Sequence, residues 1–532
     1  MYGCPNCGAG LRYDIPTEKL TCDYCNSYFD PYEYTREKDA VEQDYFETTV
    51  FTCPQCGGEV ISTDDTAAGF CSFCGASTIL DSRIRGSKRP DLIIPFRLSK
   101  DECKKAYAKF MRRAFFAPSE FRDEAFLERF RGIYVPYWVY RLSYSGEARL
   151  RGKKTERRGE FEYTYNYDLS ADIDMEYKGI SYDASSSFDD HISETIAPYK
   201  AVHMKPFTPS FLCGFYADTA DVSADLYSAD AIAFGNDQVL SVMKEQDEFR
   251  HLEVSLPTGK EAPNKTLAIS DSRAENALFP VWFLTWRKND RVAYFIMNGE
   301  SGRISADVPI DIRKFLAGSG ILALVLYVLL NLFLSLRAET GLVVVMLISA
   351  LCFLLCAKEE SSRKKREERE GDRGYLSVHK NTPKSASSKT KKKDGDGNDN
   401  KTKAEKVFTV ILWIIGGIAA LIGFANYSMN GLMISTVFFA AAAAVICIAG
   451  YGMIPAERKK TMLRQCLYLP VQLLVCAGII FSLPVRDLWY YIPSVILLVT
   501  ACFTLFYMIR QFNLLSTRPL PHYIRKGGDD RA

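Results

Sequence analysis

Four Cys-x-x-Cys elements open the chain: CPNC at residues 4–7, CDYC at 22–25, CPQC at 53–56 and CSFC at 71–74. Fourteen residues separate the two elements of each pair, and every cysteine of the second pair lies 49 positions after its counterpart. Such a repeat indicates an internal duplication of one metal-binding unit. The predicted ligands are Cys4, Cys7, Cys22, Cys25, Cys53, Cys56, Cys71 and Cys74.

Zinc prefers four thiolates in a tetrahedron, and a two-residue spacer lets one tight turn present two sulfurs to a single ion. Glycines follow the second cysteine of three elements, where the chain must turn beneath the metal. Apolar and β-branched residues between the elements suit the short strands of a zinc ribbon. We therefore predict two zinc ions with closed, structural coordination, with iron as the lesser alternative.

Disulfides are the competing interpretation of these cysteines. Residues 1–15 show neither a basic segment nor an apolar core, so we expect no secretory signal and a reducing environment. Paired Cys-x-x-Cys elements in such an environment are typical of metal ligands.

Zinc ribbons often bind nucleic acid, but the local charge argues against that function here. Residues 1–90 hold 8 Lys and Arg against 14 Asp and Glu, a balance of 8 − 14 = −6. Phosphate binding depends on cationic side chains. The basic cluster Arg83, Arg85, Lys88 and Arg89 is interpreted as a linker. Protein contact, or stapling of a small domain, is the favoured role of the ribbons.

The middle of the chain, residues 91–310, has the pattern of a soluble α+β domain. Ser99 and Glu102 form a capping box before one helix, Ser119 is expected to cap a second, and a third is expected from Asp221 to Lys244. Two aromatic strands, 133–140 and 277–284, each carry a central proline, which predicts paired edge strands or a duplicated unit. Their aromatic residues are expected to fill a core. A hairpin is predicted around Asn298-Gly299.

Catalytic candidates in this domain are few. Asp183, Ser185–Ser187, Asp189, Asp190 and His191 form the tightest acid and histidine cluster, although Ser187 and Asp190 also suit a helix cap and first-turn acid. His203 and His251 stand apart in the sequence. The chain contains no phosphate-binding loop, Gly-x-Ser-x-Gly or His-Glu-x-x-His motif. We predict a non-enzymatic protein without a small-molecule substrate.

The chain from residue 315 onward alternates apolar runs with short charged stretches, as a membrane domain does. About six membrane helices are predicted, in three hairpins. The runs are Phe315–Leu336, Gly341–Ala357, Val407–Ala425, Leu432–Ile454, Cys466–Leu483 and Leu488–Ile509. None of them contains Asp, Glu, Lys, Arg or His, so a transporter or channel is a weaker hypothesis.

Charge sets the predicted orientation of these helices. The segment 358–406, expected to be a disordered lysine-rich linker in contact with solvent or anionic lipid, holds 16 Lys and Arg, and the tail 510–532 is also basic. The hairpin turns offer only Arg337 and Arg486. The positive-inside rule therefore predicts a multi-pass protein of the bacterial cell membrane with both termini in the cytoplasm.

Several short motifs extend beyond the ribbons: Pro136-Tyr137-Trp138, Asp183-Ala184-Ser185, Leu212-Cys213-Gly214-Phe215, Met297-Asn298-Gly299 and Arg518-Pro519-Leu520-Pro521. Together with the tandem ribbons, they resemble a bacterial family of TFIIB-type zinc-ribbon membrane proteins found in Firmicutes. The resemblance implies protein partners of the SPFH, virion-core-like or TPM-domain type in envelope-stress systems, and hence a scaffolding role.

The predicted order along the chain is ribbon 1 at 1–35, ribbon 2 at 48–85, the soluble α+β domain at 91–310, a transmembrane hairpin at 315–357, the linker at 358–406, four transmembrane helices at 407–509 and a cytoplasmic tail at 510–532. The favoured function is an integral membrane scaffold with zinc-ribbon docking modules in membrane organisation or envelope stress. A membrane-tethered nucleic-acid or transcription-linked factor and a transporter component are the alternatives.

Overall fold

The computed structural model describes residues 3–38, 45–62, 71–77, 81–159, 161–186, 188–247, 249–255, 267, 269–333, 338–370 and 486–521, with scattered positions of 472–482. The chain divides into two compact units. Unit 1 contains the ribbons, the middle domain and the tail from Ser516, and unit 2 contains Ile310 to Leu515. The coarse order predicted from the sequence is confirmed: cysteine-bearing β segments, a soluble part of mixed helix and strand, and C-terminal helices.

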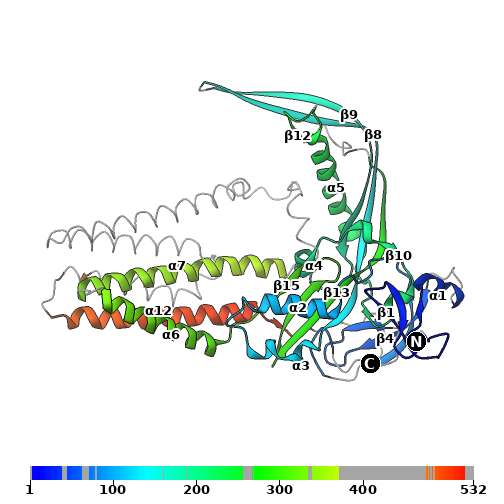
Figure 1. Ribbon diagram of the computed structural model, residues 1–532. Coiled ribbons are helices and arrows are strands. Elements are labelled where there is room, and N and C mark those ends of the chain that lie inside the picture. The colour runs from blue at the N-terminus through cyan, green and yellow to red at the C-terminus, as the bar shows by residue number, and fades with distance from the viewer. Residues whose placement is uncertain are drawn as a thin grey trace, which may run out of the picture. The chain divides into compact units, whose positions relative to one another are not determined.

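Unit 1 is organised around one large sheet (Figure 1), in which thirteen strands of the described residues take part. Its main strands are β8 (Arg131–Arg158), β9 (Phe161–Asp183), β13 (Ile269–Lys288) and β14 (Arg291–Asn298). The hydrogen-bonded path runs β10-β7-β13-β8-β11-β5-β4-β6, with β9 and β12 paired to β8 and β14 paired to β13. The first ribbon keeps a separate sheet of β1, β2 and β3.

The remaining elements are short. The strands of unit 1 are β1 (Leu11–Asp14), β2 (Lys19–Cys22), β3 (Tyr28–Phe29), β4 (Tyr45–Thr52), β5 (Glu59–Ser62), β6 (Asp81–Lys88), β7 (Leu92–Ile93), β10 (Lys205–Pro206), β11 (Tyr216–Ala217), β12 (Glu253–Ser255), β15 (Ile304–Ala306) and β16 (Arg518–Pro519). The helices are α1 (Pro31–Lys38), α2 (Lys100–Met111), η1 (Ser119–Arg122), α3 (Glu124–Leu127), α4 (Asp190–Ile196), η2 (Ala201–His203), η3 (Pro209–Leu212) and α5 (Asp225–Glu245). The basic residues Arg83 to Lys88 belong to strand β6, which pairs with β4, so their interpretation as a linker is wrong.

The two aromatic strands predicted from the sequence pair with each other, as part of β8 and β13, but they lie inside the sheet and not at its edge. Their prolines are tolerated because each lies where the strand changes its other neighbour. Pro136 lies after the stretch of β8 paired with β11 and before the stretch paired with β9. Pro280 lies between the β7-paired and β14-paired stretches of β13. A residue that cannot donate a ladder hydrogen bond costs little at such a gap.

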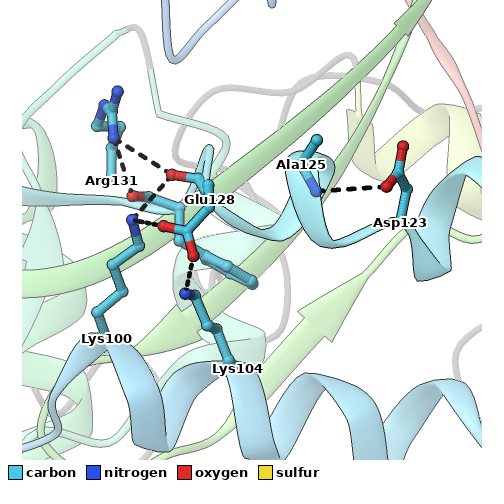
Figure 2. A network of polar contacts seen from close by, with 7 residues as sticks. Lys100, Lys104, Asp123, Ala125, Glu128 and Arg131 are labelled. Carbon is cyan, nitrogen blue, oxygen red and sulfur yellow. Dashed lines mark hydrogen bonds and ion pairs between the residues drawn. The ribbon is translucent and has the colours of Figure 1, made fainter.

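Helix α2 begins as predicted, with Ser99 and Glu102 forming a reciprocal capping box. The second predicted helix is interrupted: Ser119 starts only the 3-10 turn η1, and Asp123, in an extended conformation, caps α3 through the amide of Ala125. Figure 2 shows how this segment is held to α2, with Glu128 bonded to both Lys100 and Lys104. These exposed charges hold the pKa of Glu128 at about 2, well below its usual value.

Helix α5 covers one face of the β8–β9 hairpin and confirms the predicted third helix. Its buried residues contact Tyr140, Leu142 and Tyr144 of β8 in one apolar cluster. Gly235 permits this close approach, because a Cβ there would lie 2.4 Å from both Leu142 Cδ1 and the Tyr144 hydroxyl. Beyond the helix the hairpin runs on as a long projection (Figure 1).

Unit 2 contains the apolar helices. α6 (Ile312–Phe333), α7 (Ala338–Glu370) and α12 (Leu488–Leu515) correspond to the first, second and sixth predicted runs. α7 and α12 share an apolar cluster that includes Met346, Phe353 and Leu497. α7 extends to Glu370, so the beginning of the predicted disordered linker is helical, while residues 371–406 lie outside the described residues. The runs 407–425 and 432–454, and most of 466–483, also lie outside them.

The tail re-enters unit 1 directly after α12. β16 pairs antiparallel with β14, placing Arg518 opposite Val292 and Pro519 opposite Arg291. Arg518 Nη1 lies 2.6 Å from Asp189 Oδ2, and its Nε lies 3.5 Å from Asp307 Oδ2. Burial raises the pKa of Asp307, while Arg518 opposes that shift. The tail is therefore an integral strand of the sheet domain.

Replacing Gly235 with Ala should destabilise unit 1 by about 1–3 kcal/mol, the usual cost of adding a methyl group to a filled interface. The measurement is thermal unfolding of the purified full chain. The exposed Asp237→Ala on the same helix is the control, and should stay within about 0.5 kcal/mol of the parent. Equal unfolding temperatures for Gly235→Ala and the parent would contradict the packing of α5 on β8.

Candidate metal centres

Each cysteine element forms the same backbone turn. In the first, the amide of Gly8 donates to the carbonyl of Cys4 at 2.8 Å, and the amide of Cys4 donates to the carbonyl of Ala9 at 2.6 Å. In the second, Asn26 and Ser27 take the corresponding places around Cys22, at 2.9 and 3.0 Å. Such a turn points the amides after the first cysteine, and both side chains, toward one position.

The second cysteine set repeats these hydrogen bonds at the offset of 49 residues. Gly57 donates to Cys53 O at 2.8 Å and Gly75 donates to Cys71 O at 2.9 Å. The residue after the second cysteine has positive φ in all four turns: 76° at Gly8, 53° at Asn26, 73° at Gly57 and 71° at Gly75. Asn26 was not singled out from the sequence, although asparagine is the residue that most readily replaces glycine in this conformation.

The sulfur atoms gather as the spacing predicts. Cys4 and Cys25 Sγ lie 3.5 Å apart, as do Cys7 and Cys22. In the second group the distances are 3.7 Å for Cys53–Cys74 and 3.7 Å for Cys56–Cys71. A tetrahedron with metal–sulfur bonds of about 2.3 Å has edges of about 3.8 Å, whereas a disulfide requires about 2.05 Å. Both groups could therefore hold a metal ion, and the donor set suits zinc.

The first group, site 1, lies at the surface. Cys7 is exposed and Cys25 is partly exposed. The hydroxyl and amide of Ser27 lower the pKa of the Cys25 thiol to about 6, which favours the thiolate that a metal requires. Tyr34 of α1 closes the turn by donating to the carbonyl of Gly3 at 2.8 Å. Tyr24, between Cys22 and Cys25, is 83% exposed.

The second group, site 2, is built into the sheet domain. All four cysteines are buried, and β5 pairs with β11 of the middle domain. The Tyr294 hydroxyl donates to Phe73 O at 2.6 Å, and the Thr285 hydroxyl donates to Ser72 O. Glycine is favoured at Gly75 for a second reason, because a Cβ there would lie 3.1 Å from Arg287 Cβ, closer than an ordinary van der Waals contact. Site 2 is thus fixed between its own turns and strands β13 and β14.

The tail also reaches site 2. Leu520 packs against the apolar cluster that contains the four cysteines. The guanidinium carbon of Arg518 lies 5.9 Å from the centre of the Tyr294 ring, whose hydroxyl bonds the site 2 turn. The strand that follows α12 therefore packs against the four-cysteine group of site 2.

Residues of the predicted acid and histidine cluster make structural contacts, with different partners. Ser185 donates to Asp218, and the Ser186 amide donates to Asp221 at 2.7 Å. Asp189, and not Ser187, caps α4 through the amide of Ile192. Ser187 and the side chain of Asp190 lie outside the described residues. Metal-binding groups among the described residues are confined to the two cysteine sets.

His203 is paired in the structure, although nothing near it in the sequence suggested a partner. Its Nδ1 lies 2.5 Å from Glu300 Oε1, ninety-seven residues away. Glu300 also accepts from the amide of Lys200 at 3.1 Å. The pair holds η2 against the loop after β14, which is a structural role.

The described residues thus define a protein with two four-cysteine groups that could each hold a metal ion, a sheet domain and three helices long and apolar enough to cross a membrane, over Ile312–Leu329, Gly341–Ser361 and Leu488–Leu515. The chain is 26% identical over 320 residues to the uncharacterized protein YdjG of Bacillus subtilis strain 168. The match covers 59% of this chain and 92% of that relative. No family model matches the chain, and no solved structure matches it.

The difference in burial predicts different rates of metal loss. The full chain should release two equivalents of zinc to a colorimetric chelator in two phases, because the exposed Cys7 of site 1 admits a competing ligand and the buried site 2 does not. Replacing Cys22 and Cys25 with Ser should remove the fast phase and one equivalent, and leave membrane insertion intact. Replacing Cys71 and Cys74 with Ser should remove the slow phase.

Hydrogen exchange supplies an independent readout of the same variants. The amides of Ser516, Thr517, Arg518 and Leu520 should exchange faster in the Cys71→Ser, Cys74→Ser variant, because Leu520 and Tyr294 lose their support. They should be unchanged in the Cys22→Ser, Cys25→Ser variant. A single release phase, or unchanged metal content in either double variant, would show that the sites are not distinct metal centres.

Proposed function

We propose that this protein is a non-enzymatic integral membrane scaffold whose sheet domain is joined to the membrane at both ends and presents site 1 to a protein partner. The observation that carries the proposal is strand β16. The chain leaves unit 1 before α6 and returns to it after α12. Both ends of the proposed membrane region are therefore connected to the same sheet domain. Both metal ions are zinc in this proposal, bound by four thiolates that leave no position for a substrate.

The tail strand also supports a topology. Because β16 is hydrogen-bonded to β14, the tail and the sheet domain lie on one side of the membrane, and the number of crossings is even. The three described helices alone would give an odd number of membrane crossings. The three apolar runs predicted between residues 407 and 483, which lie outside the described residues, make six in total.

Two independent features favour the cytoplasm as that side. Lys and Arg concentrate in the segments that the topology places with the tail, in agreement with the positive-inside rule. The eight cysteines are all free thiols poised for metal, which suits a reducing compartment.

Reporter fusions to the full chain test this topology. Green fluorescent protein should fluoresce when fused before Met1 or after Ala532, and alkaline phosphatase inserted between α6 and α7 should be active. Phosphatase fused after Ala532 should be inactive and serves as the matched control. An active phosphatase at the C-terminus would place the tail opposite to the sheet domain and would contradict both the parity and the tail strand.

Docking is assigned to site 1 because only that site is open. Strands β13 and β14 and the tail cover site 2. In ribbon 1, by contrast, Tyr24 and Tyr28 are 83% and 57% exposed. Large exposed aromatic residues around a rigid metal-bound turn are typical of protein interfaces. The acidic balance of residues 1–90 does not favour nucleic acid.

Purification of the full chain from crosslinked, detergent-solubilised membranes tests the function. A partner of the SPFH, virion-core-like or TPM-domain type should co-purify with the parent and decrease at least about tenfold with Tyr24→Ala, Tyr28→Ala. Phe115→Ala, at a 73% exposed position away from ribbon 1, is the control.

Other outcomes would favour the alternatives. Nucleic acid that remains bound at moderate salt would replace the scaffold with a nucleic-acid factor. Loss of a solute flux on deletion of residues 407–509, with partner binding unaffected, would indicate a transporter component.

A further inference from the structure

The projecting end of the β8–β9 hairpin carries an exposed row of rings. We call this part the arm; it comprises Gly146–Arg158 of β8 and Phe161–Ile173 of β9, paired from Gly146↔Ile173 to Arg158↔Phe161. Figure 1 shows the arm extending well beyond the rest of the sheet. On β9 the row consists of Phe161 (71% exposed), Tyr163 (47%), Tyr165 (40%) and Tyr167 (41%).

These four rings share one face of the arm. Alternate residues of a strand point to the same side, so positions 161, 163, 165 and 167 form a row with steps of about 6.7 Å. The next residue inward on that face is Leu169, which pairs with Leu150 and belongs to the apolar cluster under α5. The row therefore continues the apolar face of the core past the point where α5 covers it.

The exposed ring area of the row is as large as that of a typical interaction surface. Each aromatic side chain can bury roughly 150–250 Å², so the four exposed fractions amount to about 400 Å² of ring surface on the arm. A contiguous apolar patch of a few hundred Å² marks an interaction surface on a soluble protein.

The charged residues on the ring face are Lys154, Glu156 and Arg158, a net charge of 2 − 1 = +1. On the ring face, Lys154 pairs with Tyr165 and Arg158 pairs with Phe161 across the hairpin. Glu156, the acid of that face, is bonded to both Lys154, at 2.7 Å, and Arg158, at 3.2 Å. Residues 146–173 hold six Lys and Arg against six Asp and Glu, so the arm as a whole is neutral and the cationic excess belongs to the ring face.

We propose that the ring face of the arm lies on the lipid bilayer, with the rings at the boundary of acyl chains and headgroups and Lys154 and Arg158 on anionic headgroups. Tyrosine rings with cations beside them are typical of membrane interfaces, where one end of the ring is apolar and the other hydrated. Three of the four rings, those of Tyr163, Tyr165 and Tyr167, carry a hydroxyl that can stay hydrated at the headgroups.

The covalent attachment of unit 1 to membrane-spanning helices strengthens this assignment over other occupants. A bilayer is always within reach of the domain, which gives a weak contact a high effective concentration. A second copy of the ring face is a poorer occupant, because each face carries a net positive charge from Lys154, Glu156 and Arg158. This contact does not depend on site 1 or on any protein partner.

Photocrosslinking of the full chain tests the proposal. The protein carries p-benzoylphenylalanine in place of Tyr163, and is reconstituted into nanodiscs of phosphatidylcholine with or without phosphatidylglycerol. Mass spectrometry should show a lipid adduct at position 163, severalfold stronger with phosphatidylglycerol. The same probe in place of Thr164, which is exposed on the opposite face of the same strand, is the matched control and should give at least about fivefold less adduct.

A charge-reversal variant distinguishes binding to anionic lipid from non-specific hydrophobic binding. Lys154→Glu, Arg158→Glu should reduce the adduct at 163 roughly tenfold in discs with phosphatidylglycerol, while zinc content stays at two equivalents and reports intact folding. Equal adducts at 163 and 164, an adduct to a second copy or to nucleic acid, or no lipid adduct at 163 would each overturn the proposal.

Discussion

The antiparallel pairing of β8 with β13 is the contact on which the rest of unit 1 depends. It runs from Tyr144 opposite Ile269 to Arg131 opposite Phe283, and it connects residues more than a hundred positions apart. Most other parts of unit 1 attach to one of these two strands, while ribbon 1 keeps its own three-stranded sheet. Ribbon 2 joins through β11 and β5, the arm is the outward continuation of β8 with β9, and the tail joins through β14. The prolines at 136 and 280 are compatible with this central position because each marks a change of neighbour.

The two metal sites share one backbone design but have different surroundings, which separates their roles. Duplication preserved the four turns, their hydrogen bonds and the positive φ after each second cysteine. In site 2, β5 pairs with β11 and all four cysteines are buried, whereas ribbon 1 has its own small sheet and an exposed Cys7. A metal site with no free coordination position acts through the shape it holds. At site 2 the fold of the turns supports the contacts of Leu520 and Tyr294. At site 1 it supports the exposed surface around Tyr24.

The sequence predicted what depends on local chemistry. The cysteine spacing, the capping box at Ser99 and the apolar lengths of α6, α7 and α12 are each encoded within a few turns of chain. The sequence did not predict contacts made across long separations. Nothing near His203 indicates Glu300, and nothing near Arg518 indicates Asp189 or Asp307. The arm was missed although Phe161, Tyr163, Tyr165 and Tyr167 alternate with polar residues, which is a strand signal. The helix predicted after Ser119 is divided into η1 and α3, because Asp123 is extended and caps α3.

The tail strand is short, and its stability follows from the closed path of the chain. A two-residue strand and one partly buried arginine would hold a free peptide weakly, because the entropy lost in ordering the segment exceeds the free energy of so few contacts. Here α12 ends at Leu515, immediately before the strand, and the chain before α6 is already part of the same domain. The segment between Ile310 and Leu515 is thus joined to the sheet domain at both ends. Because the tail is tethered to that domain through the rest of the chain, ordering it costs less entropy than binding a free peptide. Arg518 can therefore hold the tail in place by pairing with Asp189 and Asp307, while Leu520 packs against the site 2 cluster.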